Sequence, residues 1–234
     1  MSAQWVDNLR RRALDAFAPA RCLYCESAAG AALICPACAA RLPYNTPACP
    51  GCALPQGHEA PCPACLQQPR PFDGACCAFT LGVPVQAAIH GLKYEARFQA
   101  AQALARRMAA SLRSRDAPLP EVLVPVPLHP RRLMRRGYNQ ALELARVIGA
   151  ELAIPVWPQA ARRLRHTPDQ IGMSAVQRRR NLRGAFACGP ELRGLHVALF
   201  DDVMTTGATL GELARVVRQS GATRVEAWAL ARTP

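Results

Sequence analysis

Paired cysteines limit the fold of the first third of this chain more than any other feature. The chain has 234 residues and 11 cysteines, ten of which precede residue 78. Eight of the ten form Cys-x-x-Cys pairs: Cys22, Cys25, Cys35, Cys38, Cys49, Cys52, Cys62 and Cys65. Nine residues separate the first pair from the second, and nine separate the third from the fourth, so the arrangement repeats with a period of 27 residues. The segment therefore predicts two small units of one kind.

Two neighbouring pairs supply four thiolates, which is the closed tetrahedral ligand set of a structural zinc site. A segment with so few large apolar side chains depends on metal binding for its folding energy. We therefore expect two structural zinc ions. The four cysteines of residues 22–38 bind one, and the four cysteines of residues 49–65 bind the other. Two alternatives stay open: the two inner pairs share one ion, or the cysteines form disulfides in an oxidising compartment.

The second informative segment is residues 197–210, which read VALFDDVMTTGATL. Its first four residues predict a buried strand that ends at two carboxylates, Asp201 and Asp202. The hydroxyl-rich residues after them lead into a helical pattern, and backbone amides at such a helix start can bind a phosphate. Carboxylates instead suit sugar hydroxyls, with help from a divalent cation. The segment predicts a phosphorylated sugar as ligand; the alternative is an ordinary turn and a capped helix.

The same segment resembles the phosphoribosyl pyrophosphate (PRPP) site of type I phosphoribosyltransferases. The resemblance implies that Asp201 and Asp202 are the catalytic pair and hold the ribose 2- and 3-hydroxyls, with Mg²⁺ bound together with PRPP. It also implies that the following loop holds the 5-phosphate. The loop residues are Thr205, Thr206, Gly207, Ala208 and Thr209.

Beyond a proline-containing link that ends near residue 72, apolar runs alternate with helical patterns. Strands are predicted at 75–81, 122–126, 197–200 and 225–230, and helices at 85–94, 100–112, 139–152 and from 210 onward. This alternation is typical of an α/β domain with a mostly parallel sheet, whose ligands bind at the carboxyl ends of the strands. We expect an N-terminal helix at 1–20, a double zinc ribbon at 21–72 and a type I phosphoribosyltransferase-like domain at 73–234.

A proline-rich run follows the second predicted strand and precedes a cluster of arginines. If this run holds an anion, its backbone donors are Leu128, His129 and Arg131. The guanidinium groups behind them are those of Arg131, Arg132, Arg135 and Arg136. Such chemistry suits a pyrophosphate. Lys93 is the only lysine in the chain, and its compact ammonium group is expected at the same pyrophosphate site. The alternative is a rigid proline turn with solvated arginines.

Seven arginines and a single acid lie between residues 162 and 183. This composition predicts a flexible basic flap that closes over a pyrophosphate leaving group and excludes water. The residues assigned to the flap are Arg163, Thr167, Gln170, Arg178 and Asn181. A merely solvated basic loop is the alternative.

Taken together, the motifs occur in the order seen in ComF family proteins. Besides the cysteine pairs and the Asp-Asp-Val loop, the shared motifs are Leu92-Lys93-Tyr94, Val124-Pro125-Val126-Pro127-Leu128, Arg136-Gly137-Tyr138-Asn139-Gln140, Arg163 with Thr167 and Gln170, and Arg178 with Asn181. ComF proteins are double zinc ribbon, phosphoribosyltransferase-like proteins associated with DNA uptake in naturally competent bacteria and with use of DNA as a nutrient. The resemblance implies the same role here; it departs at Tyr138, where Phe is common in the family.

The charge of the chain is strongly basic. The net charge is +13, and residues 73–234 hold most of the surplus, with 23 basic and 12 acidic side chains. Such a surplus favours polyanions through counterion release, and the family implies single-stranded DNA and the DNA-uptake machinery as partners. No early apolar stretch is long enough for a signal peptide or a membrane span. We therefore expect a cytoplasmic protein without membrane insertion.

Two functional hypotheses follow. In the first, the chain is a type I phosphoribosyltransferase that transfers ribose 5-phosphate from Mg-PRPP to an unknown acceptor and releases pyrophosphate. In the second, it is a non-catalytic DNA-uptake factor that binds single-stranded DNA and uses the PRPP site as a regulatory pocket.

Overall fold

The computed structural model describes residues 20–165 and 175–234. Apart from its last position, the helix expected at 1–20 lies outside these residues. The chain divides into two compact units, Met1–Leu42 and Pro43–Pro234. The first ribbon belongs to the first unit. The second ribbon belongs to the same compact unit as the α/β body, so the boundary expected near residue 72 lies inside that unit.

The first unit is built around its cysteines. It contains a short 3-10 helix, η1 (Gly30–Ala32), and one turn of α-helix, α2 (Pro36–Ala40). Cys35 is the N-cap of α2, and its sulfur accepts a hydrogen bond from the backbone N–H of Cys38. Pro36 occupies the first helical position, where its missing N–H has no intrahelical partner to lose. The cysteine pair itself therefore starts the helix.

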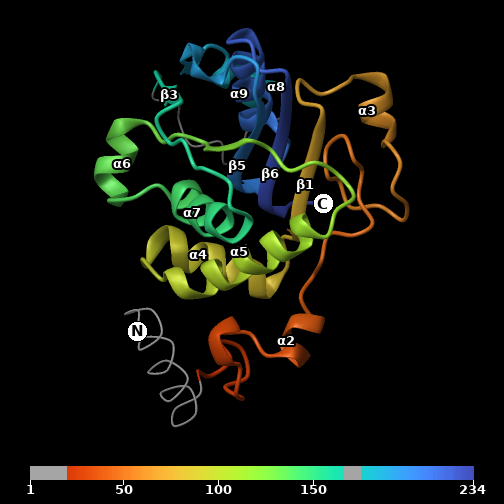
Figure 1. Cartoon of the computed structure of the whole chain (residues 1–234), viewed down its shortest axis with the longest axis vertical. Coiled ribbons are helices and arrows are strands. Elements are labelled where there is room, and N and C mark those ends of the chain that lie inside the picture. The colour runs from red at the N-terminus through yellow and green to blue at the C-terminus, as the bar shows by residue number, and fades with distance from the viewer. Residues whose placement is uncertain (1–19, 166–174) are drawn as a thin grey trace, which may run out of the picture. The chain divides into compact units, whose positions relative to one another are not determined.

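A four-stranded parallel sheet forms the centre of the second unit (Figure 1). Its strands, in spatial order, are β1 (Gly74–Thr80), β6 (Arg224–Arg232), β5 (His196–Met204) and β2 (Val122–Pro125). The two central strands are almost entirely buried, and the paired residues Phe200 and Trp228 are fully enclosed. Burial on both faces explains why these strands read as continuous apolar runs rather than as alternating ones.

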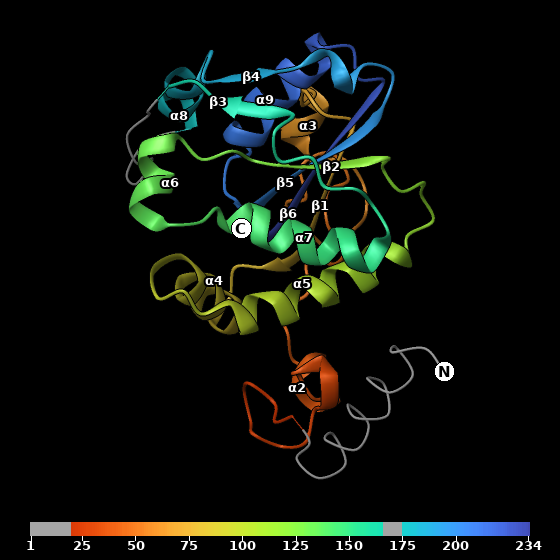
Figure 2. The ribbon, with the colours of Figure 1, turned by 60° about the vertical axis from the view of Figure 1, so that its left-hand side comes forward.

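Helices cover both faces of this sheet. The first face carries α4 (Val83–Tyr94), α5 (Phe98–Arg113) and α7 (Gln140–Leu152), and the second carries α9 (Ala208–Gln219) with α8 (Ala175–Leu182) beside it. Figure 2 shows the sheet between these two layers. The remaining elements are α3 (Pro63–Gln67), α6 (Pro130–Arg136), η2 (Pro190–Leu192) and a two-stranded antiparallel sheet of β3 (Ala161–Arg163) and β4 (Phe186–Cys188). None of the helices within the described ranges is both long enough and apolar enough to cross a membrane.

The second ribbon continues directly into the edge of the sheet. The backbone N–H of Asn45 donates to the carbonyl of Ala78 at 3.0 Å, and the N–H of Thr80 donates to the carbonyl of Pro43 at 2.8 Å. The N–H of Ala75 donates to Pro50 within the ribbon, also at 2.8 Å. These bonds use the free edge of β1, which would otherwise be exposed to pairing with other chains. The ribbon is thus part of the sheet's architecture.

Most elements of the body agree with the sequence predictions to within about four residues, but α6, α8 and the β3–β4 pair were not predicted. α6 begins with Pro130 and ends at Gly137, whose φ is 85°. None of its seven residues, all of them described, is buried, so it has no apolar stripe that periodicity could detect. In the segment predicted as a basic flap, Arg163 lies in a strand, and α8 buries Leu182 completely.

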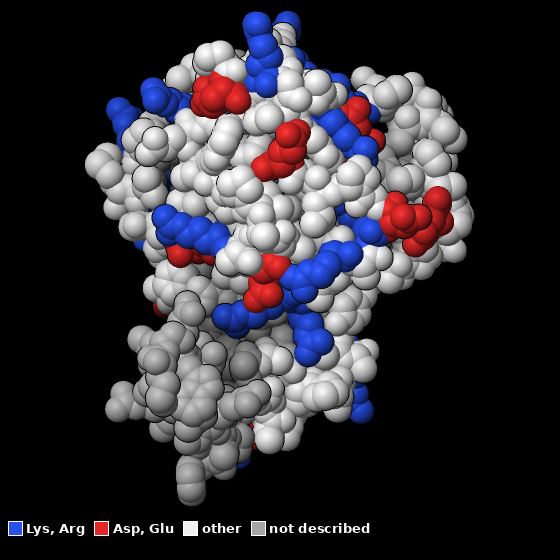
Figure 3. Space-filling view, in the orientation of Figure 1, with Lys and Arg blue, Asp and Glu red and all other residues white. Residues whose placement is uncertain are grey.

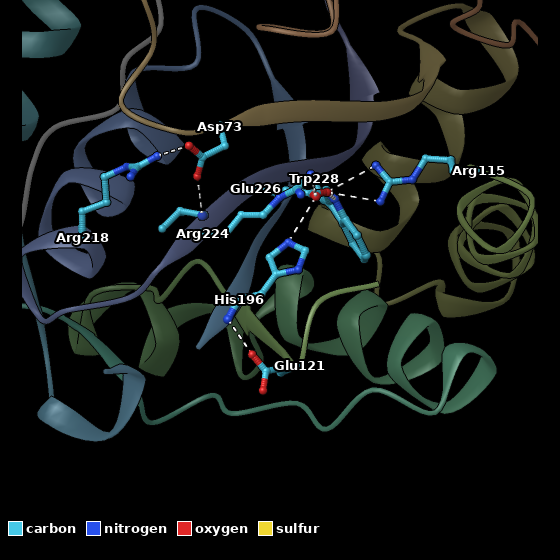
Figure 4. Close-up of polar contacts among 9 residues, drawn as sticks. Asp73, Arg115, Glu121, His196, Arg218, Arg224, Glu226 and Trp228 are labelled. Atoms are coloured by element: carbon cyan, nitrogen blue, oxygen red, sulfur yellow. Dashed lines mark hydrogen bonds and ion pairs between the residues drawn. The ribbon is translucent and has the colours of Figure 1, made fainter. Parts of the chain in front are cut away.

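A buried carboxylate joins the amino-terminal ends of the central strands (Figure 4). Glu226 is only 3% exposed, and its Oε2 accepts hydrogen bonds from Arg115 at 3.2 Å and from the indole of Trp228 at 2.9 Å. Its Oε1 lies 3.1 Å from both His196 and Arg224. Burial raises the pKa of Glu226, but the Trp228 hydrogen bond and the neighbouring cations outweigh burial, so the net pKa is lowered. The carboxylate therefore stays ionised inside the fold.

We expect Glu226→Gln to destabilise the chain by about 3 kcal/mol, because it removes the buried charge that pairs with the half-buried Arg115 and with Arg224. Urea unfolding of the zinc-loaded chain measures this loss. Glu151→Gln is the matched control, since Glu151 pairs with Arg106 on the surface at 3.7 Å, and it should cost less than about 1 kcal/mol. Equal stability of the two variants would contradict a structural role for the Glu226 cluster.

Candidate ligand site and metal centres

The eight paired cysteines form two separate clusters. Within each, the four sulfurs all lie within 4.8 Å of one another. Cys22, Cys25, Cys35 and Cys38 make the first cluster, and Cys49, Cys52, Cys62 and Cys65 make the second. Each cluster therefore combines two consecutive pairs, and the shared-ion alternative, which needs both inner pairs together, is not what the structure shows. All eleven cysteines fall within the described residues and are free thiols.

The protonation of the clusters indicates that they need a cation. Burial raises the pKa of the Cys22 thiol, but backbone N–H donors, first that of Cys35, outweigh burial and lower the pKa to about 6. The same balance lowers the pKa of Cys49 to about 7. A hydrogen bond with a neighbouring thiol raises the pKa of Cys38 to about 12, and burial raises that of Cys52 to about 12. Four thiolates can share one cluster only around a positive ion, so the donor set fits structural zinc.

We expect elemental analysis to find two zinc ions per chain. Replacing Cys25 and Cys38 by serine should leave one, with the Pro43–Pro234 unit still folded, because that unit is compact without the first cluster. Replacing Cys52 and Cys65 should also leave one zinc but should lower the melting temperature of the body, because the second cluster is built into it. A folded chain that contains no metal would refute both assignments.

The acid pair lies within β5. This strand runs beyond the predicted residues 197–200 to Met204, so Asp201 and Asp202 lie inside it rather than after its end. Successive side chains of a strand point to opposite faces. Accordingly, Asp202 meets residues of α4 and α7, whereas Asp201 lines the hollow formed by the loop after the strand. Both acids also line one larger cavity.

Lys93 and Gln140 hold Asp202, which is 3% exposed. Lys93 on α4 forms an ion pair with Oδ2, and Gln140, the first residue of α7, donates to Oδ1 at 3.4 Å. Burial raises the pKa of Asp202, but the charge of Lys93 and its hydrogen bond outweigh burial and lower the net pKa. Burial likewise lowers the pKa of Lys93, and Asp202 more than restores it. Both groups are therefore charged at neutral pH.

Asp201 behaves in the opposite way. Burial, the charge of Asp202 and a hydrogen bond between the two acids raise its pKa well above the usual value, and Lys93 offsets this only in part. Its Oδ1 accepts a hydrogen bond from the backbone N–H of Asp202 at 2.9 Å. The pair therefore carries one negative charge readily. It can hold the second when a cation or a hydrogen-bond donor arrives at Asp201.

The loop after β5 forms a small hollow with the start of α9. Gly207 is the N-cap of α9 with a φ of 74°, a left-handed conformation that glycine adopts without strain. The hydroxyl of Thr206 accepts a hydrogen bond from the backbone N–H of Ala208 at 3.3 Å. Asp201 and the residues from Val203 to Leu210 line a hollow of about 20 Å³. All five loop residues singled out from the sequence, Thr205 to Thr209, therefore lie around one space.

A larger cavity of about 630 Å³ adjoins the hollow. The two share Asp201, Val203, Thr205 and Thr209. Its other walls come from α4, the end of β2, α6 and β3, and its ionisable lining is mostly basic. The basic lining residues are Lys93, Arg132, Arg135, Arg136 and Arg163, together with His90. The structure thus brings the acid pair, the hydroxyl-rich loop and a group of arginines to one cavity at the carboxyl end of the sheet.

The residues expected to bind pyrophosphate are only partly in this cavity. Leu128, Lys93 and Arg136 line it. His129 and Arg131 are not among its lining residues: His129 is the N-cap of α6, and its Nδ1 accepts a hydrogen bond from the backbone N–H of Arg131 at 3.2 Å. That N–H, expected as an anion donor, is used to cap the helix. Lys93 lines the cavity and is also paired with Asp202.

The predicted flap residues are also divided. Arg163 lines the cavity, with its guanidinium carbon 5.5 Å from the centre of the Phe186 ring. Thr167 and Gln170 lie outside the described residues. Arg178 and Asn181 belong to α8, where Asn181 is half-buried.

The sequence placed Gln140 only within a shared motif, and it named two cavity arginines, Arg132 and Arg135, only as members of the arginine cluster after the proline-rich run. The amide of Gln140 accepts a hydrogen bond from Arg136 at 2.7 Å while it donates to Asp202, so it links the basic wall to the acid pair. Its position after Asn139, an N-cap residue type, was a usable signal, since the side chain of Asn139 does cap α7. The two arginines follow an N-cap and a proline, which together could have predicted the α6 turn.

These features define a double zinc ribbon protein with a parallel α/β domain. Sequence comparison agrees, because a family described as "Double zinc ribbon domain" matches residues 13–66. The DNA utilization protein YhgH of Salmonella typhi is 38% identical over 205 residues, covering 86% of this chain and 90% of that protein. Competence protein F of Haemophilus influenzae is 33% identical over 222 residues, covering 91% and 96%. The chain therefore belongs to the ComF family, and the fold class predicted from the sequence is confirmed.

Solved structures give a weaker likeness. Glutamine PRPP amidotransferase from B. subtilis aligns with 55% of this chain at 20% identity and a TM-score of 0.38, and this chain spans about a quarter of that structure's length. Adenine phosphoribosyltransferase from Leishmania donovani aligns with 61% of this chain and 68% of its own, at 14% identity and a TM-score of 0.36. With scores this low, the fold class rests on the sheet, the ribbons and the relatives.

Proposed function

We propose that the cavity at the carboxyl end of the sheet binds Mg-PRPP and that the chain transfers ribose 5-phosphate to an acceptor. The observation that supports this most strongly is an adjacent acid pair, with Asp202 buried and Asp201 half-buried, between two different surroundings. One is a hydroxyl-rich helix start suited to a phosphate, and the other is a basic cavity suited to a diphosphate. A ribose with anionic groups at C5 and at C1 has the same arrangement of chemistry.

The three parts of the ligand have distinct places in this proposal. The 5-phosphate occupies the hollow of Thr205 to Thr209, and the ribose 2- and 3-hydroxyls donate to the two carboxylates. The pyrophosphate lies against Arg136 and Lys93, with Arg132 and Arg135 nearby on α6. Thr167, Gln170, Arg178 and Asn181 stay a proposal as flap residues, with Arg163 at the cavity wall.

The chain's own groups act by positioning and by charge. As the bond between the ribose C1 and the pyrophosphate oxygen breaks, positive charge develops on the ribose ring, and the negative charge of the acid pair stabilises it. Negative charge grows on the leaving pyrophosphate, where the arginines of α6 stabilise it. Mg²⁺ would neutralise part of the pyrophosphate charge and is expected to bind with it. The acceptor attacks C1 directly, so these residues orient the reactants and form no covalent bond with them.

Mg-PRPP titration tests the acid pair. Isothermal titration of the zinc-loaded chain with Mg-PRPP should show binding, and Asp201→Asn combined with Asp202→Asn should weaken it at least about 100-fold. The reason is that two hydrogen bonds to charged groups, roughly 1.5–3 kcal/mol each, are lost. Asp116→Asn is the control, because Asp116 is exposed. Unchanged affinity in the double variant would remove the assignment.

The pH dependence of Mg-PRPP affinity tests the charge of Asp201. Because the pKa of Asp201 is raised, Mg-PRPP affinity should rise with pH as Asp201 loses its proton. Lys93→Met should move this rise to higher pH, since loss of a nearby cation raises the pKa of both carboxyls. Lys93→Arg keeps the charge and should retain the wild-type profile. Asp201→Asn is the control: it removes the titrating group, so any pH dependence that remains comes from the phosphates of the ligand. If the pH profile of Lys93→Met matches that of the wild type, this electrostatic role is wrong.

The names of the relatives supply the cellular context. Proteins that share a third or more of this sequence over nearly its whole length are named for DNA utilization and for competence. We therefore place the proposed activity in the uptake of DNA or its use as a nutrient. Single-stranded DNA and the uptake machinery are the partners proposed on the same ground.

Non-catalytic DNA binding is the second candidate, and the basic cavity wall favours it over other non-enzymatic roles. On the face of the body seen in Figure 3, Lys and Arg are interspersed with Asp and Glu rather than gathered in one patch. The arginines of α6 instead concentrate basic charge at the cavity. Both candidates include Mg-PRPP binding, so release of pyrophosphate on addition of acceptor nucleobases or amines separates the enzyme from a regulatory pocket.

A further inference from the structure

We infer that Arg232 couples the second cysteine cluster to the hydroxyl-rich loop, so that metal in the cluster and ligand at the loop stabilise each other. The coupling deepens the proposed function. The part of it that concerns bound ligand rests on that function. Arg232 is the last residue of β6 and is paired in the sheet with Met204, the last residue of β5. Its side chain is 6% exposed and so belongs to the interior.

The guanidinium group of Arg232 contacts the ribbon on one side and the loop on the other. Its Nε donates to the carbonyl of Cys52 at 3.1 Å, and Cys52 is a member of the second cluster. Its Nη1 donates to the carbonyl of Met204 at 3.2 Å and also to that of Thr205, where the loop begins. One rigid planar group therefore fixes the distance between a metal-binding turn and the proposed phosphate loop.

Charge explains why an arginine is buried at this point. Four thiolates around a divalent ion carry a net negative charge, and a buried charge needs compensation nearby. Arg232 lies against the Cys52 turn. Arg70 forms a hydrogen bond with the thiol of Cys65, another member of the cluster. Loss of the metal frees the Cys52 turn, so its carbonyl no longer fixes the Nε of Arg232.

A second contact connects the ribbon to the same loop region. The chain leaving the ribbon packs on α9: the Cγ of Pro71 lies 3.3 Å from the position that a Cβ would occupy at Gly211 in the first turns of that helix. Arg218 further along α9 donates to the carbonyl of Pro71 at 3.0 Å. The loop is thus held at its start by Arg232, and the helix after it is held by the ribbon's exit. The first cluster belongs to the other compact unit and gives an internal comparison.

Amide hydrogen exchange of the zinc-loaded full chain tests the role of Arg232 without any ligand. In Arg232→Met, peptides covering residues 203–210 should exchange about 10-fold faster, because two hydrogen bonds from a charged donor to the loop are lost. Arg232→Lys, with one compact donor group, should give a smaller increase and serves if the methionine variant does not fold. Arg146→Met is the control, since Arg146 pairs with Glu143 on the surface. Unchanged exchange at 203–210, or an equal increase across residues 122–125 and 140–152, overturns the inference.

Zinc release tests the coupling itself. With Cys25→Ser and Cys38→Ser removing the first cluster, saturating Mg-PRPP should slow chelator-induced release of the remaining zinc by about 5-fold or more, because ligand at the loop also holds the Cys52 turn through Arg232. Addition of Arg232→Met should abolish this slowing. The variant with Asp201→Asn and Asp202→Asn is the control, because free PRPP can itself bind released zinc, and this effect persists in a chain that does not bind PRPP. A chain that binds Mg-PRPP and releases zinc at an unchanged rate overturns the coupling. A chain that does not bind Mg-PRPP refutes the proposed function, and the exchange measurement then decides the role of Arg232 alone.

Discussion

The enclosure of two adjacent carboxylates in a central strand, with Asp202 buried and Asp201 half-buried, is the constraint on which the site depends. A carboxylate taken out of water is costly unless cations and donors meet it, and β5 is covered on both faces. Because side chains alternate along a strand, the two acids lie in different surroundings: Asp202 points toward α4 and α7, and Asp201 points toward the loop. The first is satisfied inside the protein by Lys93. The second keeps a raised pKa and so retains its capacity to bind something from outside.

The helices around the acids are positioned by local capping chemistry. Asn139 caps α7 with its Oδ1 and donates with its Nδ2 to the carbonyl of Val126 at 3.0 Å, which ties the start of the helix to the end of β2. Gln140 is thereby placed beside Asp202. Tyr138, next to them, donates to the carbonyl of Leu92, adjacent to Lys93. One short segment therefore sets the positions of both partners of the buried acid.

The sequence was a good guide wherever physics leaves a periodic or spaced signal. Buried parallel strands gave apolar runs, amphipathic helices such as α9 gave a stripe, and metal ligands gave a fixed spacing. α6 gave none of these, because it buries nothing and is defined by Pro130 and Gly137 alone. The pairing of Lys93 with Asp202 left no such signal, because the two are 109 residues apart in sequence and only the packing of α4 against the sheet brings them together.

Arg232 could not be recognised from the sequence at all. It ends a buried strand, and nothing in its neighbours along the chain indicates that Cys52 and Thr205 lie beside it. What distinguishes it is burial of a charge, and burial is a property of the folded chain. Arginine at this point can be explained only once the ribbon is placed on the edge of the sheet, since that placement brings the thiolate cluster and the loop to opposite sides of one guanidinium group.

The polar network of the cavity also narrows the class of ligand. Arg136 donates to Gln140, Gln140 donates to Asp202, and Asp202 pairs with Lys93, so the orientation of the amide is fixed by a donor on one side and an acceptor on the other. Arg136 also lies 5.7 Å from the centre of the Tyr94 ring, which holds its guanidinium in place. A ligand that meets this wall needs anionic oxygens for the arginines and hydroxyl donors for the acids, close together in one molecule. A bare nucleobase offers neither, and a single-stranded DNA backbone lacks the 2-hydroxyl, whereas a ribose that carries a pyrophosphate offers both.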